Sequence, residues 1–455
     1  MRRISIDLGI FVKFWILLVL ICFLSQCQAL GQEQDEVFVP DNPGAASFDQ
    51  IFLFDSKTWL GWRVQKDGPY GGGRFTIEDG AICSDPAHPG LVLTTGQFAD
   101  IALDFEMQAA PESDVFLLLR TSPSPKNLAT SCYAIVLAAS SAHPDRNICT
   151  FQGRRLANFR TEDAPPDPAS ADGSIPWKRF TVFADEKAVR VNCGAFFNNE
   201  SFDEESVRLG FIGFLVTKGK VRFKNITWIP TRSLPMISTA DRNMIFWNLP
   251  EEGSTFSIAS RIPDVVLQGG PGMIETKRSY GNFIIRAEFN AVGNETKGDI
   301  FFRCLPDKAF SGYRCVIDNQ PGPKNESPDV LNERIGGLYG LRDARNVGAK
   351  NDKWNMIVVK VIDNHIQTWV NGVQTIDYFD RRTVDETNDA QKGLRLQEGT
   401  IQIGTRSFGS RLMFRNIEIA PIPKRWISRE EEKRMIEERA RMFTPPKSIV
   451  DVTVE

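Results

Sequence analysis

Three arginines and a tyrosine occupy positions in the second half of this 455-residue chain where they could contact a polar ligand. Arg303 and Arg406 each follow a short strand-like run, and Arg314 stands near the start of another, Tyr313 to Asp318. Guanidinium groups form planar, often bidentate hydrogen bonds, so they could hold hydroxyl, carbonyl or acidic groups. We interpret Arg303, Tyr339 and Asn371 as candidate substrate-binding residues.

A carboxylate at the end of one of these runs adds possible acid–base chemistry. Asp318 follows Arg314 by four residues, and we predict Asp318, Arg314 and Arg406 as the candidate catalytic group. A general base of this kind needs a pKa close to the working pH. Arg303 occupies an outward position of its own strand and is expected on the same face as Arg314. The alternative is a solvated sheet face on which Asp318 pairs with an arginine. Glu333 is a second possible carboxylate.

The elements that must position these residues occur twice. Trp177-Lys-Arg-Phe180 reads onto Trp354-Asn-Met-Ile357, a separation of 177 residues. Val221-Arg-Phe-Lys-Asn-Ile226 reads onto Leu412-Met-Phe-Arg-Asn-Ile417, a separation of 191 residues. Solenoid repeats are about 20–50 residues long, so this period indicates two tandem domains. An activity of one copy could once have belonged to both.

Within each copy the segments are short and alternate in polarity, with Gly, Pro, Asn or Asp between them. For example, Phe283, Ile285, Ala287 and Phe289 share one face of a strand, with polar residues between them. Asn371-Gly372 predicts the tight turn of a hairpin. The predicted fold class is all-β, with two tandem jelly-roll β-sandwiches and a short C-terminal helix. The predicted organisation is a signal peptide over 1–31, a linker over 32–47, a first domain over 48–231, a linker over 232–243, a second domain over 244–423 and a charged helical tail over 424–455.

The N-terminus predicts export. Arg2 and Arg3 precede an apolar run over 14–24, and Ala29-Leu-Gly31 provides small residues for cleavage before Gln32. The run is shorter than the roughly 20 residues of a membrane span, although an uncleaved anchor is the alternative. We therefore expect a secreted, periplasmic or cell-envelope protein with no stable membrane span after cleavage. The chain has 54 basic and 57 acidic residues and no basic stripe, which argues against nucleic acid as a partner.

The numbers and positions of the cysteines and histidines limit which disulfides and metal sites this chain could form. Cleavage of the signal would leave six of the eight cysteines. Cys304 and Cys315 fall on consecutive predicted strands and are candidates for a disulfide, with two free buried thiols as the alternative. The only histidines are His88, His143 and His365, and no Cys/His cluster occurs, so no zinc site and no cofactor are expected. A calcium ion on a sandwich rim is left open.

Several motifs, taken in order, resemble one known family. They are Gly298-Asp-Ile-Phe-Phe-Arg303, Gly312-Tyr-Arg-Cys-Val-Ile-Asp318, Gly336-Gly-Leu-Tyr339, Trp369-Val-Asn-Gly372 and Phe414-Arg-Asn-Ile417. The chain resembles the 3-keto-disaccharide hydrolase domain family, long known only as a domain of unknown function. This resemblance implies bacterial, secreted jelly rolls of the laminin G-like and concanavalin A-like type. It covers nearly all of the mature chain in two copies and is closer in the second.

The resemblance also implies a reaction and a partner. Domains of this family cleave the glycosidic bond of a sugar already oxidised at carbon 3, so the expected partner is carbohydrate. The 3-keto group acidifies the neighbouring carbon–hydrogen bond. A base can then remove that proton, the aglycone leaves by elimination, and water adds afterwards. Such a site needs a general base and a polar group that stabilises the enolate.

This chain departs from the family at the residues expected to react. The family has a Tyr-Glu-Val-Gln strand with Glu and Gln on its open face, where the second copy has Arg314 and Val316. The histidine of a later Leu-Gln-x-His motif is replaced by Arg406. The first copy has Ala134 and Thr217 at the Glu and His positions, which predicts an almost wholly apolar face.

Three hypotheses follow from the resemblance and these departures. The first is a secreted glycan-processing hydrolase of the 3-keto-disaccharide hydrolase type, active in the second domain. The second is a tandem jelly-roll protein that binds carbohydrate without catalysis. The third is a cell-envelope scaffold or interaction protein.

Overall fold

A computed structural model describes residues 50–422, except for 139–147, 152–153, 159–173, 186–187, 194–195, 202–208, 238–243, 250–256, 262–263, 294–295, 307, 319–333, 346–347 and 388. The predicted signal peptide, first linker and helical tail lie outside the described residues. Within the described part, no helix is both long and apolar enough to cross a membrane.

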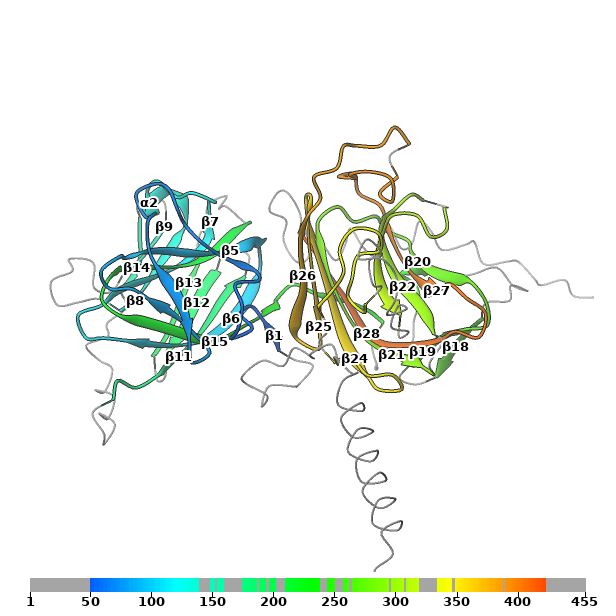
Figure 1. The fold of residues 1–455 in the computed structure, drawn as a ribbon, viewed down its shortest axis with the longest axis horizontal. Helices are drawn as coiled ribbons and strands as arrows, with labels where there is room; N and C mark the ends of the chain where they lie inside the picture. The colour runs from blue at the N-terminus through cyan, green and yellow to red at the C-terminus, as the bar shows by residue number, and fades with distance from the viewer. Residues whose placement is uncertain are drawn as a thin grey trace, which may run out of the picture. The chain divides into compact units, whose positions relative to one another are not determined.

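The first half of the chain forms a two-sheet sandwich (Figure 1). Its elements are β1 (Ile51–Phe52), β2 (Trp62–Val64), β3 (Phe75–Glu78), β4 (Ala81–Ser84), β5 (Gly90–Phe98), β6 (Ile101–Ala109), β7 (Asp114–Thr121), α2 (Leu128–Ser131), β8 (Tyr133–Ala138), β9 (Ile148–Phe151), β10 (Arg154–Asn158), β11 (Lys178–Asp185), β12 (Ala188–Cys193), β13 (Phe196–Ser201), β14 (Gly210–Lys218) and β15 (Val221–Pro230). Sheet A has the order β13-β12-β11-β6-β15-β4-β3 with β1 on β15, and sheet B the order β10-β9-β8-β7-β14-β5-β2.

The second half repeats this architecture (Figure 1). Its strands are β16 (Leu234–Ile237), β17 (Trp247–Asn248), β18 (Ser257–Arg261), β19 (Asp264–Gln268), β20 (Gly272–Thr276), β21 (Phe283–Val292), β22 (Lys297–Cys304), β23 (Tyr313–Asp318), β24 (Asn355–Ile362), β25 (His365–Val370), β26 (Val373–Phe379), β27 (Thr400–Thr405) and β28 (Arg411–Pro421). Sheet C has the order β18-β19-β28-β21-β24-β25-β26 with β16 on β28, and sheet D the order β17-β20-β27-β22-β23. The predicted all-β class with two tandem sandwiches is confirmed.

Strand alternation builds the core of each sandwich, as the sequence pattern predicts. In β21, the four apolar residues Phe283, Ile285, Ala287 and Phe289 are all buried in the second core. Ile357, Val359 and Val361 of the neighbouring β24 join them. Removing this much apolar surface from water is the main force that holds two such sheets face to face.

A buried arginine interrupts the same strand in both sandwiches. Arg120 in β7 and Arg303 in β22 each have φ of 52°, a left-handed conformation that non-glycine residues rarely adopt. The pairing register shifts beside each of them, which identifies a β-bulge. Arg120 donates to Asp100 at 2.9 Å, whereas Arg303 donates to the Gly281 carbonyl oxygen at 3.0 Å. Each arginine therefore fixes the turn at the start of the long strand that precedes its own strand in the chain and lies in the opposite sheet, β6 or β21.

A second arrangement also recurs, and it involves the two tryptophans of the sequence repeat. The Arg415 guanidinium lies 4.1 Å from the ring centroid of Trp354 and donates to Glu288 at 2.7 Å. Glu288 also accepts from Asn416, whose φ is positive, at 2.9 Å. The first copy repeats the arrangement with Trp177, Lys224, Glu106 and Asn225. Both tryptophans are half-buried beside a cation.

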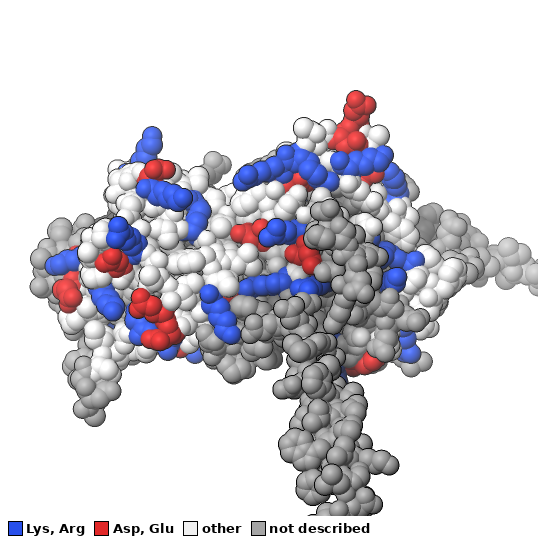
Figure 2. All heavy atoms as spheres, in the orientation of Figure 1, with Lys and Arg blue, Asp and Glu red and all other residues white. Residues whose placement is uncertain are grey.

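Surface charges of both signs lie near one another. Figure 2 shows basic and acidic side chains interspersed on the face in view. This agrees with the nearly equal numbers of basic and acidic residues in the sequence.

Replacing Arg303 with alanine should destabilise the second sandwich by about 3 kcal/mol, because buried carbonyl groups would lose their charged donor. Urea unfolding of the mature chain measures the change in free energy. Arg411→Ala, at an exposed arginine of β28, is the matched control and should change it by less than about 0.5 kcal/mol. Equal losses in the two variants would contradict a structural role for Arg303.

Candidate functional site

The outward face of sheet D carries two rows of residues that the strand register aligns. Residues directly opposite each other on antiparallel strands point to the same face. One row consists of Glu275, Gln402, Phe301 and Arg314, and the other of Met273, Gly404, Asp299 and Val316. Polar and charged side chains therefore cluster on a sheet face that alternation directs away from the core.

Asp299 lies at the centre of the charged part of this face. It is 0% exposed, and its Oδ1 is 2.9 Å from Arg314 Nε. Arg406 Nε donates to its other carboxylate oxygen. Burial raises the pKa of Asp299 to about 6, and the two guanidiniums act in the opposite direction. Asp299 therefore anchors two arginines: Arg314, near the start of β23, and Arg406, just after the end of β27.

Tyr339 brings an exposed aromatic ring to the same place. Its ring is 48% exposed, and its centroid lies 3.8 Å from Arg314 Cζ. Its backbone N–H donates to the Arg314 carbonyl oxygen at 3.0 Å, so the 334–345 loop is fixed along β23. The outer surface of the site is therefore an aromatic ring stacked on a guanidinium that a buried carboxylate holds.

The other polar residues of the face hold a neighbouring loop. Glu275 accepts from the Gln402 amide at 2.9 Å and from the Thr400 hydroxyl. Gln402 in turn accepts from the Phe310 N–H at 2.9 Å and donates to the Lys308 carbonyl oxygen at 3.0 Å. These contacts attach the loop between β22 and β23 to the sheet.

The structure brings together three of the residues singled out from the sequence, namely Arg314, Arg406 and Tyr339. The expectation that Arg303 shares a face with Arg314 is wrong. The bulge at Arg303 ends the alternation of β22, and burial lowers the pKa of its guanidinium to about 10. Arg303 instead donates to the Arg395 carbonyl oxygen at 2.7 Å.

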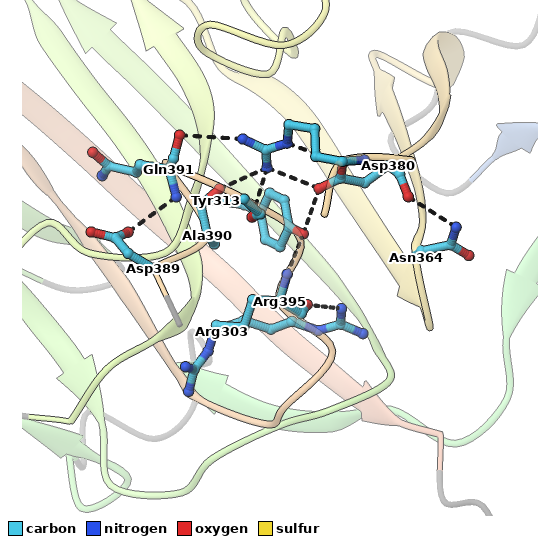
Figure 3. Close-up of polar contacts among 10 residues, drawn as sticks. Arg303, Tyr313, Asn364, Asp380, Asp389, Ala390, Gln391 and Arg395 are labelled. Carbon is cyan, nitrogen blue, oxygen red and sulfur yellow. Dashed lines mark hydrogen bonds and ion pairs between the residues drawn. The ribbon is translucent and has the colours of Figure 1, made fainter. Parts of the chain in front are cut away.

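Arg303 takes part in a buried hydrogen-bond network (Figure 3). The Tyr313 hydroxyl donates to Asp380 at 2.7 Å and accepts from the Arg395 N–H at 3.0 Å. Arg382 donates to both Asp380 oxygens, at 3.0 and 2.8 Å. Burial raises the pKa of Tyr313 to about 12, so it remains a donor. The network fixes the loop between β26 and β27, and Arg303 belongs to it.

Asn371 and Asp318 do not join the site as described. Asn371 and Gly372 have φ of 49° and 83°, which confirms the predicted Asn-Gly hairpin turn between β25 and β26. Asn371 accepts from the Met356 N–H at 2.9 Å and donates to Asn355 at 3.1 Å, so we assign it to the turn. Asp318 ends β23, and its side chain lies outside the described residues, as does Glu333.

Cys304 and Cys315 are free thiols, which corrects the predicted disulfide. The register places Ile300, rather than Cys304, opposite Cys315. The Cys304 thiol donates to the Ser311 carbonyl oxygen at 2.9 Å. Burial raises the pKa of both thiols, so they are unreactive small hydrophobic groups. The described residues contain no group of three or more His, Cys, Asp or Glu side chains that could hold a metal ion.

The first sandwich has the same two rows with different chemistry. Its rows are Leu93, Gly213, Leu118 and Ala134, and Leu91, Leu215, Phe116 and Val136. All of the apolar side chains among them are buried in one cluster. Phe116 takes the place of Asp299, and Ala134 that of Arg314. The apolar face predicted for the first copy is confirmed.

Sequence reasoning missed Asp299, although a signal was present. Asp299 and Phe301 are two residues apart in one strand and share its outward face. Extending the alternation backward from Phe301, away from the bulge, would have found the carboxylate.

The fold and the site define a class of protein: tandem β-sandwiches in which one sheet face is charged and its counterpart is apolar. The model of the 3-keto-alpha-glucoside-1,2-lyase-like domain matches residues 49–229 and 245–420. The chain belongs to this family and contains two copies of the domain, as the motifs predicted. Its function is accordingly glycan-related.

Solved structures resemble single sandwiches of this chain at low sequence identity. A putative glycosyl hydrolase from Parabacteroides distasonis is 20% identical, with a TM-score of 0.34, over 42% of this chain and 100% of its own. A carbohydrate-binding module from Bacillus subtilis is 13% identical, with a TM-score of 0.29, over 37% and 95%. A beta-glucanase from Bacillus licheniformis is 10% identical, with a TM-score of 0.29, over 42% and 98%. No curated protein matches significantly.

Asp299 should make stability depend on pH between about 4 and 6. Its folded-state pKa of about 6 exceeds the usual 3.8, so the stability it contributes is complete below about 3.8 and lost as pH rises through 6. Asp299→Asn should flatten the change in unfolding free energy across this window, by on the order of 3 kcal/mol. Urea titrations of both proteins between pH 4 and 7 measure it. Parallel pH profiles would contradict the raised pKa.

Proposed function

We propose that the Asp299 end of sheet D binds carbohydrate, with Tyr339, Arg314 and Arg406 as its contact residues. One observation carries the proposal: a single buried carboxylate anchors two guanidiniums beside an exposed tyrosine, and only the second copy has this arrangement. Family membership supports a sugar as the ligand. The export signal predicted over 1–31 would bring the domain to glycans outside the cytoplasm.

The chemistry of these side chains suits a sugar. An aromatic ring with one open face can stack on the apolar face of a pyranose, while its polar edge meets water. Guanidinium groups donate in a fixed plane, which matches vicinal hydroxyls or a carbonyl oxygen. Because Asp299 holds Arg314 and Arg406 before a ligand arrives, less side-chain freedom is lost on binding. Asp299 itself lies beneath both arginines and acts here as a positioning residue.

Tyr339→Ala should weaken glycan binding at least about tenfold, which corresponds to about 1.4 kcal/mol of stacking and ring contact. Isothermal titration with a panel of gluco-oligosaccharides measures the dissociation constants. Arg406→Ala should weaken binding in the same way. Phe183→Ala, at an exposed aromatic residue of the first sandwich, is the matched control and should leave binding unchanged. Wild-type affinity in the Tyr339 and Arg406 variants would rule out this site.

Cleavage of 3-keto-glycosides is the second candidate function, and a specific observation favours it. Asp299 has a pKa of about 6, which suits a group that takes up and releases protons near neutral pH. A displacement of Arg314 would have to expose the carboxylate before it could reach the proton next to a 3-keto group. Arg406 would then face the enolate oxygen, where a positive charge stabilises it.

The mature protein should release the aglycone from a chromogenic 3-keto-glucoside, and Asp299→Asn should reduce this rate at least about a hundredfold. Glu275→Gln changes a carboxylate on the same face and is the matched control, with an expected rate close to that of the wild type. If the wild-type protein cleaves the substrate no faster than the uncatalysed reaction but still binds glycan measurably, the lyase function is excluded and the binding function remains.

A further inference from the structure

A lysine is buried where the two sandwiches meet. Both sandwiches belong to one compact unit. Lys360 of β24 is 2% exposed, and its Nζ donates to Gln367 at 2.7 Å. The Phe98 ring of the first sandwich lies 3.7 Å from the same Nζ. A Cβ added at Gly96 would lie 2.7 Å from Nζ and overlap Gln367, so the end of β5 is fitted closely to this lysine.

Two further titratable groups share the cluster. His365 Nε2 is 2.6 Å from Asp377 Oδ1, and Gln367 donates to the same oxygen at 3.0 Å. His365 comes from β25 and Asp377 from β26. The side chains that the first sandwich contributes, Phe98 and Thr95, do not titrate. Among the described residues, the charge that faces Lys360 is therefore that of Asp377, with His365 as the neighbouring base.

Aromatic contacts surround this polar cluster. Trp369 of β25 meets Trp228 of the first sandwich edge-on, with ring centroids 5.5 Å apart. The Trp369 indole N–H donates to the Phe52 carbonyl oxygen at 3.0 Å. Elsewhere along the contact, Arg345 donates to Asp55 at 2.7 Å. The contact thus combines apolar packing, a cross-domain ion pair and an enclosed lysine.

Comparison with the first copy shows which part of the molecule buries Lys360. In the first copy, Phe183 and Arg190 pair across β11 and β12 just as Lys360 and Gln367 pair across β24 and β25. Phe183 is 37% exposed and Arg190 is exposed. This face is therefore open to solvent where no sandwich covers it, and the first sandwich is what encloses Lys360.

We propose that the two sandwiches form a proton-controlled contact, which tightens when Lys360 is neutral and loosens on acidification. An ammonium group enclosed by Phe98, Gly96 and Gln367 loses its hydration, and the one nearby carboxylate does not restore it. Separating the sandwiches returns Lys360 to water, where it takes up a proton. The contact is then a switch whose state follows the pH of the surroundings.

The direction of the effect follows from linkage. Burial lowers the pKa of Lys360 to about 7, against 10.5 in water. Between these values separation binds a proton, so the docking constant rises up to about tenfold per pH unit and is lowest below pH 7. Burial also lowers the pKa of His365, and the pKa of Asp377 is lowered as well. His365 and Asp377 pair with each other within the second sandwich and keep that partner on separation, so the proton taken up between the two pKa values of Lys360 is assigned to this lysine.

Small-angle X-ray scattering of the mature chain between pH 5 and 9.5 tests the proposal, with circular dichroism to confirm that each variant is folded. Gly96→Ala, which forces the end of β5 off Lys360, provides the separated reference. The radius of gyration of the wild type should shift toward that reference as pH falls. Lys360→Met should stay docked at every pH, and Lys360→Leu replaces it if that variant does not fold.

Lys353→Met, at an exposed lysine just before β24, is the matched control and should follow the wild type. A wild type that keeps one radius throughout the pH range would overturn the proposal. So would a Lys360→Met protein that separates along the wild-type curve.

Discussion

The buried arginine in a left-handed conformation is the constraint on which each sandwich depends. It occurs at Arg120 in β7 and at Arg303 in β22, each in the sheet of its sandwich that has fewer strands. A guanidinium enclosed by protein must donate to acceptors that the chain supplies, because water cannot reach it. In the second copy these acceptors come from the turn before β21 and from the loop that carries Arg395. The bulge also ends the regular alternation of β22, so Asp299 and Phe301 face outward and Arg303 does not.

Comparison of the two copies distinguishes side chains that stabilise the fold from side chains that could bind a ligand. Both copies keep the bulge arginine, and both keep a tryptophan beside a cation and a carboxylate. Such features survive in a copy whose sheet face has become apolar, so they serve the architecture. The Asp299 group has no equivalent in the first copy, where Phe116 replaces the carboxylate. Changing these few side chains converts a charged surface into a second apolar cluster without altering the strand order.

Sequence periodicity was sufficient for the all-β class, the tandem repeat, the Asn-Gly turn and the apolar face of the first copy. Each of these depends on local alternation or on turn chemistry, which a single sequence displays. The predictions for Arg303 and for the Cys304–Cys315 pair failed for one shared reason. A bulge and a connecting loop set the register of β22 against β23, and register depends on contacts between strands that alternation does not encode. Arg314 and Arg406 were recognised as a group, but their shared partner Asp299 was not.

The contact between the sandwiches joins two different surfaces: the ends of strands β1, β5 and β15 of the first copy and a sheet face of the second. Contacts of this heterologous kind can be repeated, and a repeated one builds an open filament unless something ends the series. Here the sheet face of the first copy that would receive the next unit presents Arg190 and a half-exposed Phe183. The first copy has a charged Arg190 where the second has Gln367, so the same sheet face is open to solvent in one copy and covered in the other.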